Sequence, residues 1–141
     1  MNDVLIISDN LEIAYKVDIR FSNAGWSNKN MSVMAMMALN SGSTNHYQCI
    51  VLVVDIDLLK RFGSVIKEMS AMIRNISKQS PLYLIFEGDY DPIFSVWTQY
   101  GRQFFTLSMD RTQLPKVINK IITLESEYLP TTNYCSPMDA I

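Results

Sequence analysis

The stretch Ile50–Asp55, with the sequence IVLVVD, decides the predicted fold. Its first five residues are apolar without alternation and mostly β-branched, which is typical of a strand buried on both faces of a parallel sheet. Two runs of a similar kind stand on either side of it in the sequence, at Val4–Ile7 and Leu82–Phe86. We therefore expect three central strands of a parallel sheet that is covered by other elements on both faces.

Helical patterns separate these runs and follow them. In Arg111–Glu125, apolar residues recur at the spacing of one helix face, and Thr112 is the favoured cap because Pro115 then falls in the first turn, where its missing N–H costs little. Two further strands are predicted, one at Phe104–Leu107 and a weaker one around Met31–Met34. The other helices are expected at Ile13–Phe21, Met34–Leu39, Val65–Ile73 and Pro92–Tyr100.

The alternation of strands and helices fixes the fold class. A length of 141 residues suits one domain. Strands separated by helices are expected to run parallel, and the right-handed crossover rule then favours a doubly wound sheet. The prediction is an α/β fold with a five-stranded parallel sheet in the order 2-1-3-4-5.

Composition excludes several classes of protein. The formal net charge is −2, and no stretch clusters Lys and Arg, so contact with DNA would require a domain outside this chain. The two cysteines, Cys49 and Cys135, are far apart, and His46 is the single histidine, which leaves little for a disulfide framework, a zinc site or a Ser-His triad. No apolar run has the length of a membrane span and no signal peptide is recognisable, so we expect a soluble, cytoplasmic protein.

Acidic residues stand where two predicted strands end. Asp9 lies between Ser8 and Asn10 after the first strand, and Asp55 and Asp57 follow the central one. In doubly wound sheets, functional groups gather at these carboxyl ends, and carboxylates are the ligands that Mg²⁺ prefers. The pattern resembles the receiver domain of bacterial response regulators. The resemblance implies that Asp9 belongs to a metal-binding acidic pair and that Asp55 is the phosphoacceptor.

The chain departs from the receiver pattern at the other functional positions. The second member of the acidic pair is Ser8 or Asn10, and neither carries charge. The family's hydroxyl residue after strand four falls near Ile85, in a run without Ser or Thr, and its lysine after strand five falls on Leu107. The groups that stabilise and read a phosphoryl group are therefore missing. We expect no efficient phosphorylation, no catalysis and no cofactor.

Two interpretations of the strand-end acids stay open. Asp9 and Asp55 either hold Mg²⁺ weakly or have a structural role, and for Asp9 that role would be to cap the helix that follows. Weak phosphorylation at Asp55 is the corresponding functional alternative. Asp57 is interpreted as the residue that leads from the loop into the next helix.

An aromatic cluster indicates a surface for a protein partner. Trp97, Tyr100, Phe104 and Phe105 are close together in the sequence, and one short helix and one strand cannot easily bury all four. Receivers use this region for partner contact, and large rings dominate interface energies. Trp97, Tyr100 and Phe104 are therefore the candidate partner-binding residues, and a homodimer is the favoured assembly.

The end of the chain narrows the resemblance. Thr112–Ile118 (TQLPKVI) and Glu125–Pro130 (ESEYLP) resemble the last receiver helix and linker of LuxR/FixJ-type transcription regulators. The resemblance implies a receiver-like domain in residues 1–125 and a linker or tail in residues 126–141 that leads to a DNA-binding domain outside this chain. A phosphorylation-independent regulatory domain of a transcription regulator is the first hypothesis. A stand-alone receiver-like adaptor in a signalling or secretion pathway is the alternative.

Overall fold

A computed structural model describes residues 2–39, 47–55, 57–88, 91–108 and 111–133 of the chain. The predicted polar loop with His46 and the end of the chain with Cys135 lie outside these residues.

The structure contains one five-stranded sheet in which every paired strand is parallel. The strand order is β2-β1-β3-β4-β5, which confirms the predicted fold class. The central strand β3 pairs with β1 and β4, and all six of its residues are buried. The strands are β1 (Asp3–Ile7), β2 (Ser27–Met31), β3 (Cys49–Val54), β4 (Leu82–Glu87) and β5 (Gln103–Leu107).

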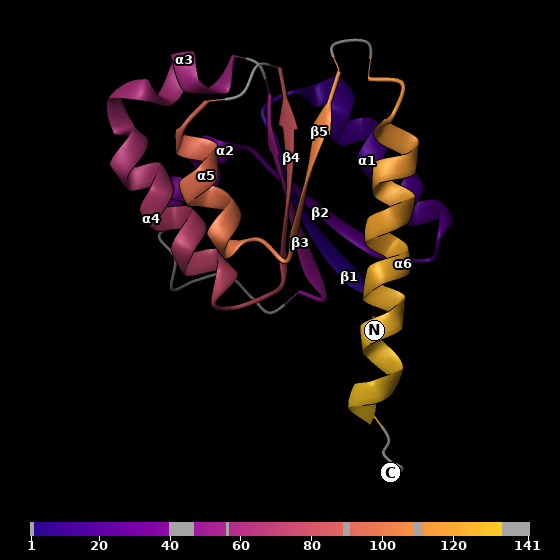
Figure 1. The fold of residues 1–141 in the computed structure, drawn as a ribbon. Helices are drawn as coiled ribbons and strands as arrows, with labels where there is room; N and C mark the ends of the chain where they lie inside the picture. Colours follow the sequence, from indigo (N-terminus) through magenta and orange to yellow (C-terminus); the bar gives the residue numbers. More distant parts are fainter. Residues whose placement is uncertain (1, 40–46, 56, 89–90, 109–110, 134–141) are drawn as a thin grey trace.

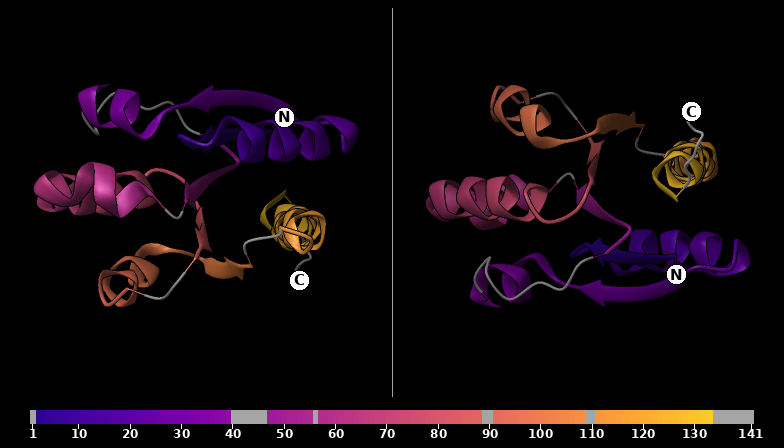
Figure 2. Two further views of the ribbon diagram at one scale, coloured as in Figure 1. Left: turned by 90° about the horizontal axis from the view of Figure 1, so that it is seen from above. Right: turned by 90° about the horizontal axis from the view of Figure 1, so that it is seen from below.

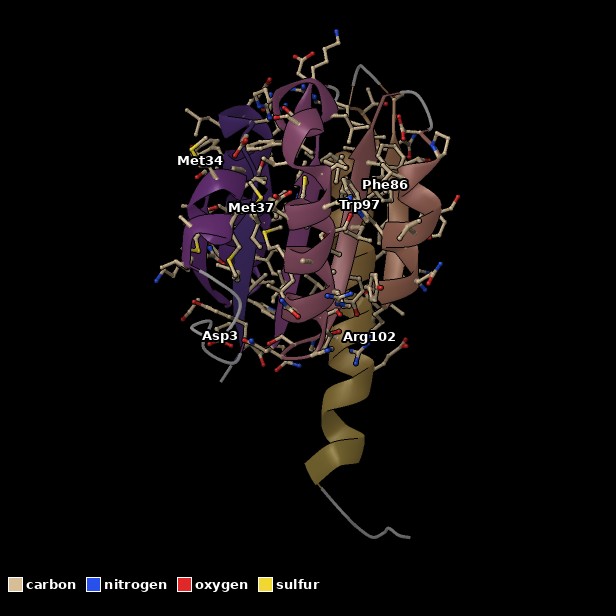
Figure 3. The ribbon with its side chains drawn as sticks, turned by 90° about the vertical axis from the view of Figure 1, so that its left-hand side faces the viewer. Asp3, Met34, Met37, Phe86, Trp97 and Arg102 are labelled. Carbon is tan, nitrogen blue, oxygen red and sulfur yellow. The ribbon has the colours of Figure 1, made fainter. Side chains whose placement is uncertain are left out.

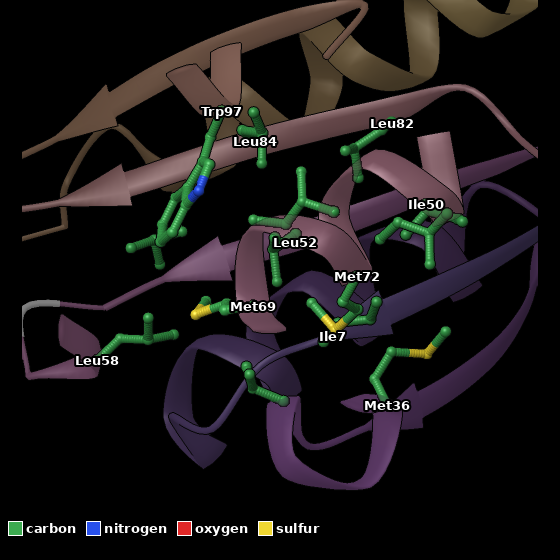
Figure 4. Packing of buried hydrophobic residues seen from close by; sticks show 14 of the residues in the cluster. Ile7, Met36, Ile50, Leu52, Leu58, Met69, Met72, Leu82, Leu84 and Trp97 are labelled. Atoms are coloured by element: carbon green, nitrogen blue, oxygen red, sulfur yellow. The ribbon is translucent and has the colours of Figure 1, made fainter. Parts of the chain in front are cut away.

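Helices cover both faces of the sheet (Figures 1 and 2). The first face is covered by α2 (Val33–Leu39), α3 (Leu58–Phe62), η2 (Gly63–Val65), α4 (Ile66–Ser77), α5 (Ile93–Trp97) and η3 (Thr98–Tyr100), and the second by α1 (Leu11–Asn23) and α6 (Leu114–Asn133). Alternate residues of the central strands therefore enter two separate cores. Figure 4 shows the first core, in which Met36 and Met69 pack against Ile7 and Leu52 of the sheet.

The weak second strand was placed wrongly by the sequence pattern. It was predicted around Met31–Met34, whereas β2 ends at Met31 and α2 begins at Val33. The strand lies at the edge of the sheet and is mostly polar. The Nδ2 groups of Asn28 and Asn30 donate hydrogen bonds to the carboxylate of Asp18 on α1, at 2.5 and 2.8 Å. Side chains from a different element thus hold a strand that carries no apolar pattern of its own.

The last helix is longer than predicted. Pro115 lies in its first turn, as expected, but α6 continues through the predicted boundary at residue 125 to Asn133, so residues 126–133 extend the helix. Figure 1 shows that this end of α6 projects beyond the rest of the fold. No helix within the described segments is both long and apolar enough to cross a membrane.

A buried carboxylate fastens α6 to the sheet. Glu125 accepts hydrogen bonds from the Tyr83 hydroxyl, from Nη1 of Arg102 at 2.5 Å and from Nε2 of Gln48 at 3.1 Å. Burial, followed by the hydrogen bond to Glu125, raises the pKa of Tyr83. Burial also raises the pKa of the neighbouring Cys49 thiol, and the charge of Glu125 adds to this effect. Arg102 is labelled in Figure 3 at the edge where β4 begins.

Candidate functional site

The strand-end acids meet at the carboxyl edge of the sheet, on the turns that follow β1 and β3. Asn10, not Asp9, caps α1: its Oδ1 accepts a hydrogen bond from the Ile13 backbone N–H at 3.0 Å. The alternative that Asp9 caps the following helix is therefore wrong. Asp9 Oδ1 instead accepts from the backbone N–H of Val33, at the start of α2, at 2.7 Å. The Ser8 hydroxyl is bound within its own turn, to the backbone of Asn10.

A guanidinium group lies between the two carboxylates. Arg61, on α3, places Nη2 3.0 Å from Asp55 Oδ1 and 3.3 Å from Asp9 Oδ2. Asp55 is buried, whereas the Arg61 side chain is 39% exposed. The pKa of Arg61 is raised: partial burial lowers it, but the hydrogen bonds and charges of Asp55 and Asp9 outweigh this effect. The chain thus supplies its own cation to the pair.

A second ion-pair cluster closes the same edge. The Arg111 guanidinium donates a hydrogen bond to the buried carboxylate of Glu87, which ends β4, and lies 2.8 Å from Glu12 Oε1 on α1. Its pKa is raised, first by the hydrogen bond to Glu87. Arg111 has a φ of 58°, a left-handed conformation that costs a non-glycine residue about 1–2 kcal/mol. The ion pairs with Glu87 and Glu12 offset that strain.

The three predicted partner-binding residues differ in how far their side chains are exposed. Trp97 is 0% exposed, packs in the first core beside Phe94 and donates a hydrogen bond from Nε1 to Ser70 Oγ at 2.8 Å (Figure 3). A role in direct partner contact requires an exposed side chain, so Trp97 does not qualify. Tyr100 is partly buried against the same core. Phe104 is 52% exposed and, with Phe86 and Phe94, lines a hollow of about 340 Å³.

No protein-family model and no curated protein sequence matches this chain. Its structure is similar to the response regulator of Hahella chejuensis, with a TM-score of 0.59 and 15% identity over 96% of this chain and 100% of that one. A response regulator receiver domain from Rhodospirillum rubrum gives a TM-score of 0.59 and 16% identity, over 89% of this chain and 94% of that domain. The chain has the receiver fold. The structure is also similar to part of lysine decarboxylase A from Pseudomonas aeruginosa, with a TM-score of 0.62 and 14% identity. The match covers 91% of this chain and 18% of the decarboxylase.

The receiver fold implies a Mg²⁺ site, which the residues present do not fit. Ser8 and Asn10 carry no charge, and their side chains are engaged in local hydrogen bonds. Both remaining carboxylates face Arg61. A divalent cation would have to displace the guanidinium or bind beside it, against a charge of its own sign. No cluster of three or more acidic, His or Cys side chains able to hold a metal occurs among the described residues.

Sequence reasoning missed both arginines and Glu87. The register of β3 and β4 places Glu87 one residue beyond Phe86, the partner of Val54, so Glu87 rather than Ile85 stands beside Asp55. Leu107 pairs with Glu87 and is buried in the second core, as its apolar character suggests. The signal available was a basic residue shortly after the ends of β3 and β5. Such residues are common, and the sequence does not say where their side chains point.

Proposed function

We propose that this chain is a receiver-like regulatory domain that works without phosphoryl transfer, as part of a bacterial transcription regulator of the LuxR/FixJ kind. It catalyses no reaction and acts by binding a second copy of itself or another protein. Any contact with DNA belongs to a domain outside this chain. The observation that carries the proposal is the guanidinium of Arg61 between Asp9 and Asp55.

Charge at the carboxyl edge supports this proposal. A phosphoryl group attached to Asp55 needs nearby cations or donors that are free to bind it. Arg61 is bound to the aspartates, and Arg111 is bound to Glu87 and Glu12. Glu87, where the family carries a hydroxyl, would face the incoming phosphoryl group with like charge. Since each state of a switch must be stabilised by its own contacts, an edge whose cations are already paired offers a phosphoryl group little to stabilise it.

Self-association through the exposed aromatic side of β5 is the proposed mode of assembly. Phe104 and the hollow that it shares with Phe86 and Phe94 present an apolar surface at the edge of the sheet. Val96, on α5, is also exposed. Exposed apolar groups of this size are common at protein interfaces.

The proposal is tested by incubation with acetyl phosphate and Mg²⁺, followed by the intact mass of the protein. We expect no added phosphoryl mass under conditions in which a conventional receiver domain is modified fully. The Asp55→Asn variant serves as the blank for modification elsewhere. Stoichiometric phosphorylation that disappears in Asp55→Asn would contradict the proposal.

A further inference from the structure

Helix α1 carries an apolar stripe on the side that faces away from the sheet. Its core-facing residues are Ile13, Val17 and Phe21, all buried. Leu11, Tyr15 and Ile19 follow one another at intervals of four residues and are 83%, 66% and 38% exposed. Residues at this spacing share one helix face. A contiguous stripe of large apolar side chains on the solvent-facing side of a helix is typical of an interaction surface.

A groove runs beside this stripe, between α1 and α6, which lie side by side in Figure 1. It consists of two hollows that share Arg20, and the first has a volume of about 430 Å³. From Leu114 to Thr123 the groove follows α6 for roughly 14 Å, or about two and a half helical turns. Its apolar lining residues are Ile19, Ala24, Leu114, Pro115, Ile118 and Ile122, of which Leu114 and Ile118 are buried.

The charged side chains that line the groove all have the same sign. They are Lys16, Arg20 and Arg111, and no described lining residue is acidic. Lys16 and Arg111 share the exposed carboxylate of Glu12. Arg20 is exposed and has no ion-pair partner among the residues that the structure describes. Because Glu12 and Glu87 neutralise Lys16 and Arg111, the uncompensated positive charge of the groove is that of Arg20. The complement of the groove is therefore apolar and negatively charged.

We propose that the α1–α6 groove binds an acidic amphipathic helix of another protein. The apolar face of that helix would lie on Ile19 and Pro115, which are exposed, and its carboxylates would face Arg20 and Lys16. An elongated groove between two helices suits a third helix better than a compact anion. A second copy bound by two-fold symmetry would place this cationic groove against itself. The inference rests on the proposed function, because it names the class of partner through which the domain acts.

The test is the affinity of the full chain for a synthetic helix, measured by fluorescence anisotropy. The probe is a stapled, labelled peptide of about four helical turns with leucines on one face and glutamates along both flanks. A peptide with the same leucines and with lysine in place of glutamate is its control. Arg20→Glu reverses the unpaired cation, and Arg74→Glu makes the same change at an exposed position on α4, on the opposite face of the sheet.

We expect the acidic peptide to bind and the basic peptide to bind at least roughly tenfold more weakly, a difference of about 1.4 kcal/mol. Arg20→Glu should lower the affinity for the acidic peptide by a similar factor, and Arg74→Glu should leave it unchanged. Equal affinity for both peptides, or equal weakening by both variants, would overturn the proposal. So would a change in sedimentation of the peptide-free protein caused by Arg20→Glu, since it would assign the groove to a second copy.

The two proposals fail separately. The binding assay contains no phosphoryl donor, so a negative result overturns the assignment of the groove alone. Modification of Asp55 by acetyl phosphate overturns phosphate independence alone. Ile19→Glu gives a second measure of the groove, because it places a carboxylate in its lining at an exposed position and should abolish binding of the acidic peptide without unfolding the chain.

Discussion

Replacement of Arg61 by alanine should destabilise the protein and create a Mg²⁺ response that the native chain lacks. Arg61 donates two charge-assisted hydrogen bonds, to Asp55 at 3.0 Å and to Asp9 at 3.3 Å. Its removal leaves two carboxylates facing each other, and that of Asp55 is only 8% exposed. Breaking a fully buried pair costs about 3–5 kcal/mol, but Arg61 is 39% exposed, so solvent screening reduces the expected loss to about 1–2 kcal/mol.

Such a loss corresponds to a decrease in Tm of roughly 3–8 °C for a domain of this size. If the freed carboxylate pair binds Mg²⁺ with a Kd of about 1 mM, then about 10 mM Mg²⁺ should raise the free energy of unfolding of the variant by about 1.4 kcal/mol. The assay is thermal unfolding followed by circular dichroism, with and without MgCl₂ at matched ionic strength. The native protein should show no Mg²⁺-dependent change in Tm.

Lys60→Ala provides the matched control. Lys60 is the neighbouring residue on α3, and its ion pair with Asp57 spans 4.0 Å between largely exposed side chains. Its loss should change stability by less than about 0.5 kcal/mol and give no Mg²⁺ response. The reasoning is refuted if Mg²⁺ raises the Tm of the native protein as much as that of Arg61→Ala. It is also refuted if Arg61→Ala is as stable as the control.

Four further predictions concern the interior and the aromatic side of β5. Burial raises the pKa of Tyr83 above the ordinary 10.0, so the unfolded chain loses the hydroxyl proton at a lower pH than the folded chain does. The free energy of unfolding should therefore fall as pH rises above about 10. Urea titrations at several pH values should show a shallower fall for Tyr83→Phe. Cys49, whose thiol pKa is also raised by burial, should escape alkylation until guanidinium unfolds the chain, and peptide mapping would distinguish it from Cys135. Trp97→Ala should cost about 3–5 kcal/mol in denaturant unfolding. Phe104→Ala should cost far less and instead weaken self-association in sedimentation at micromolar concentrations; unchanged sedimentation would count against the β5 interface.

The sequence determined the order of the elements and the two acids at the carboxyl edge. The run Ile50–Val54 predicts a strand buried on both faces, because a strand of this kind has no polar side that could face water. Asp9 and Asp55 meet because parallel strands end at one edge of the sheet. The apolar stripe of α6 likewise predicts the buried face of the helix, which carries Leu114, Ile118 and Ile121. These features follow from local patterns, and the structure reproduces them.

Tertiary structure alone decided what neutralises the acids at the carboxyl edge of the sheet. Arg61 is 52 residues from Asp9 in the sequence, and Arg111 is 99 residues from Glu12. Both pairings depend on the direction in which a long side chain leaves its element, and sequence periodicity carries no such information. Trp97 is inside for a similar reason, because Ser70 on α4 accepts the hydrogen bond of its indole and so allows the ring to be buried. Contacts between elements that are distant in the sequence form only when the layers are packed, so the packed structure was needed to tell a bound cation from a free one and a core ring from a surface ring.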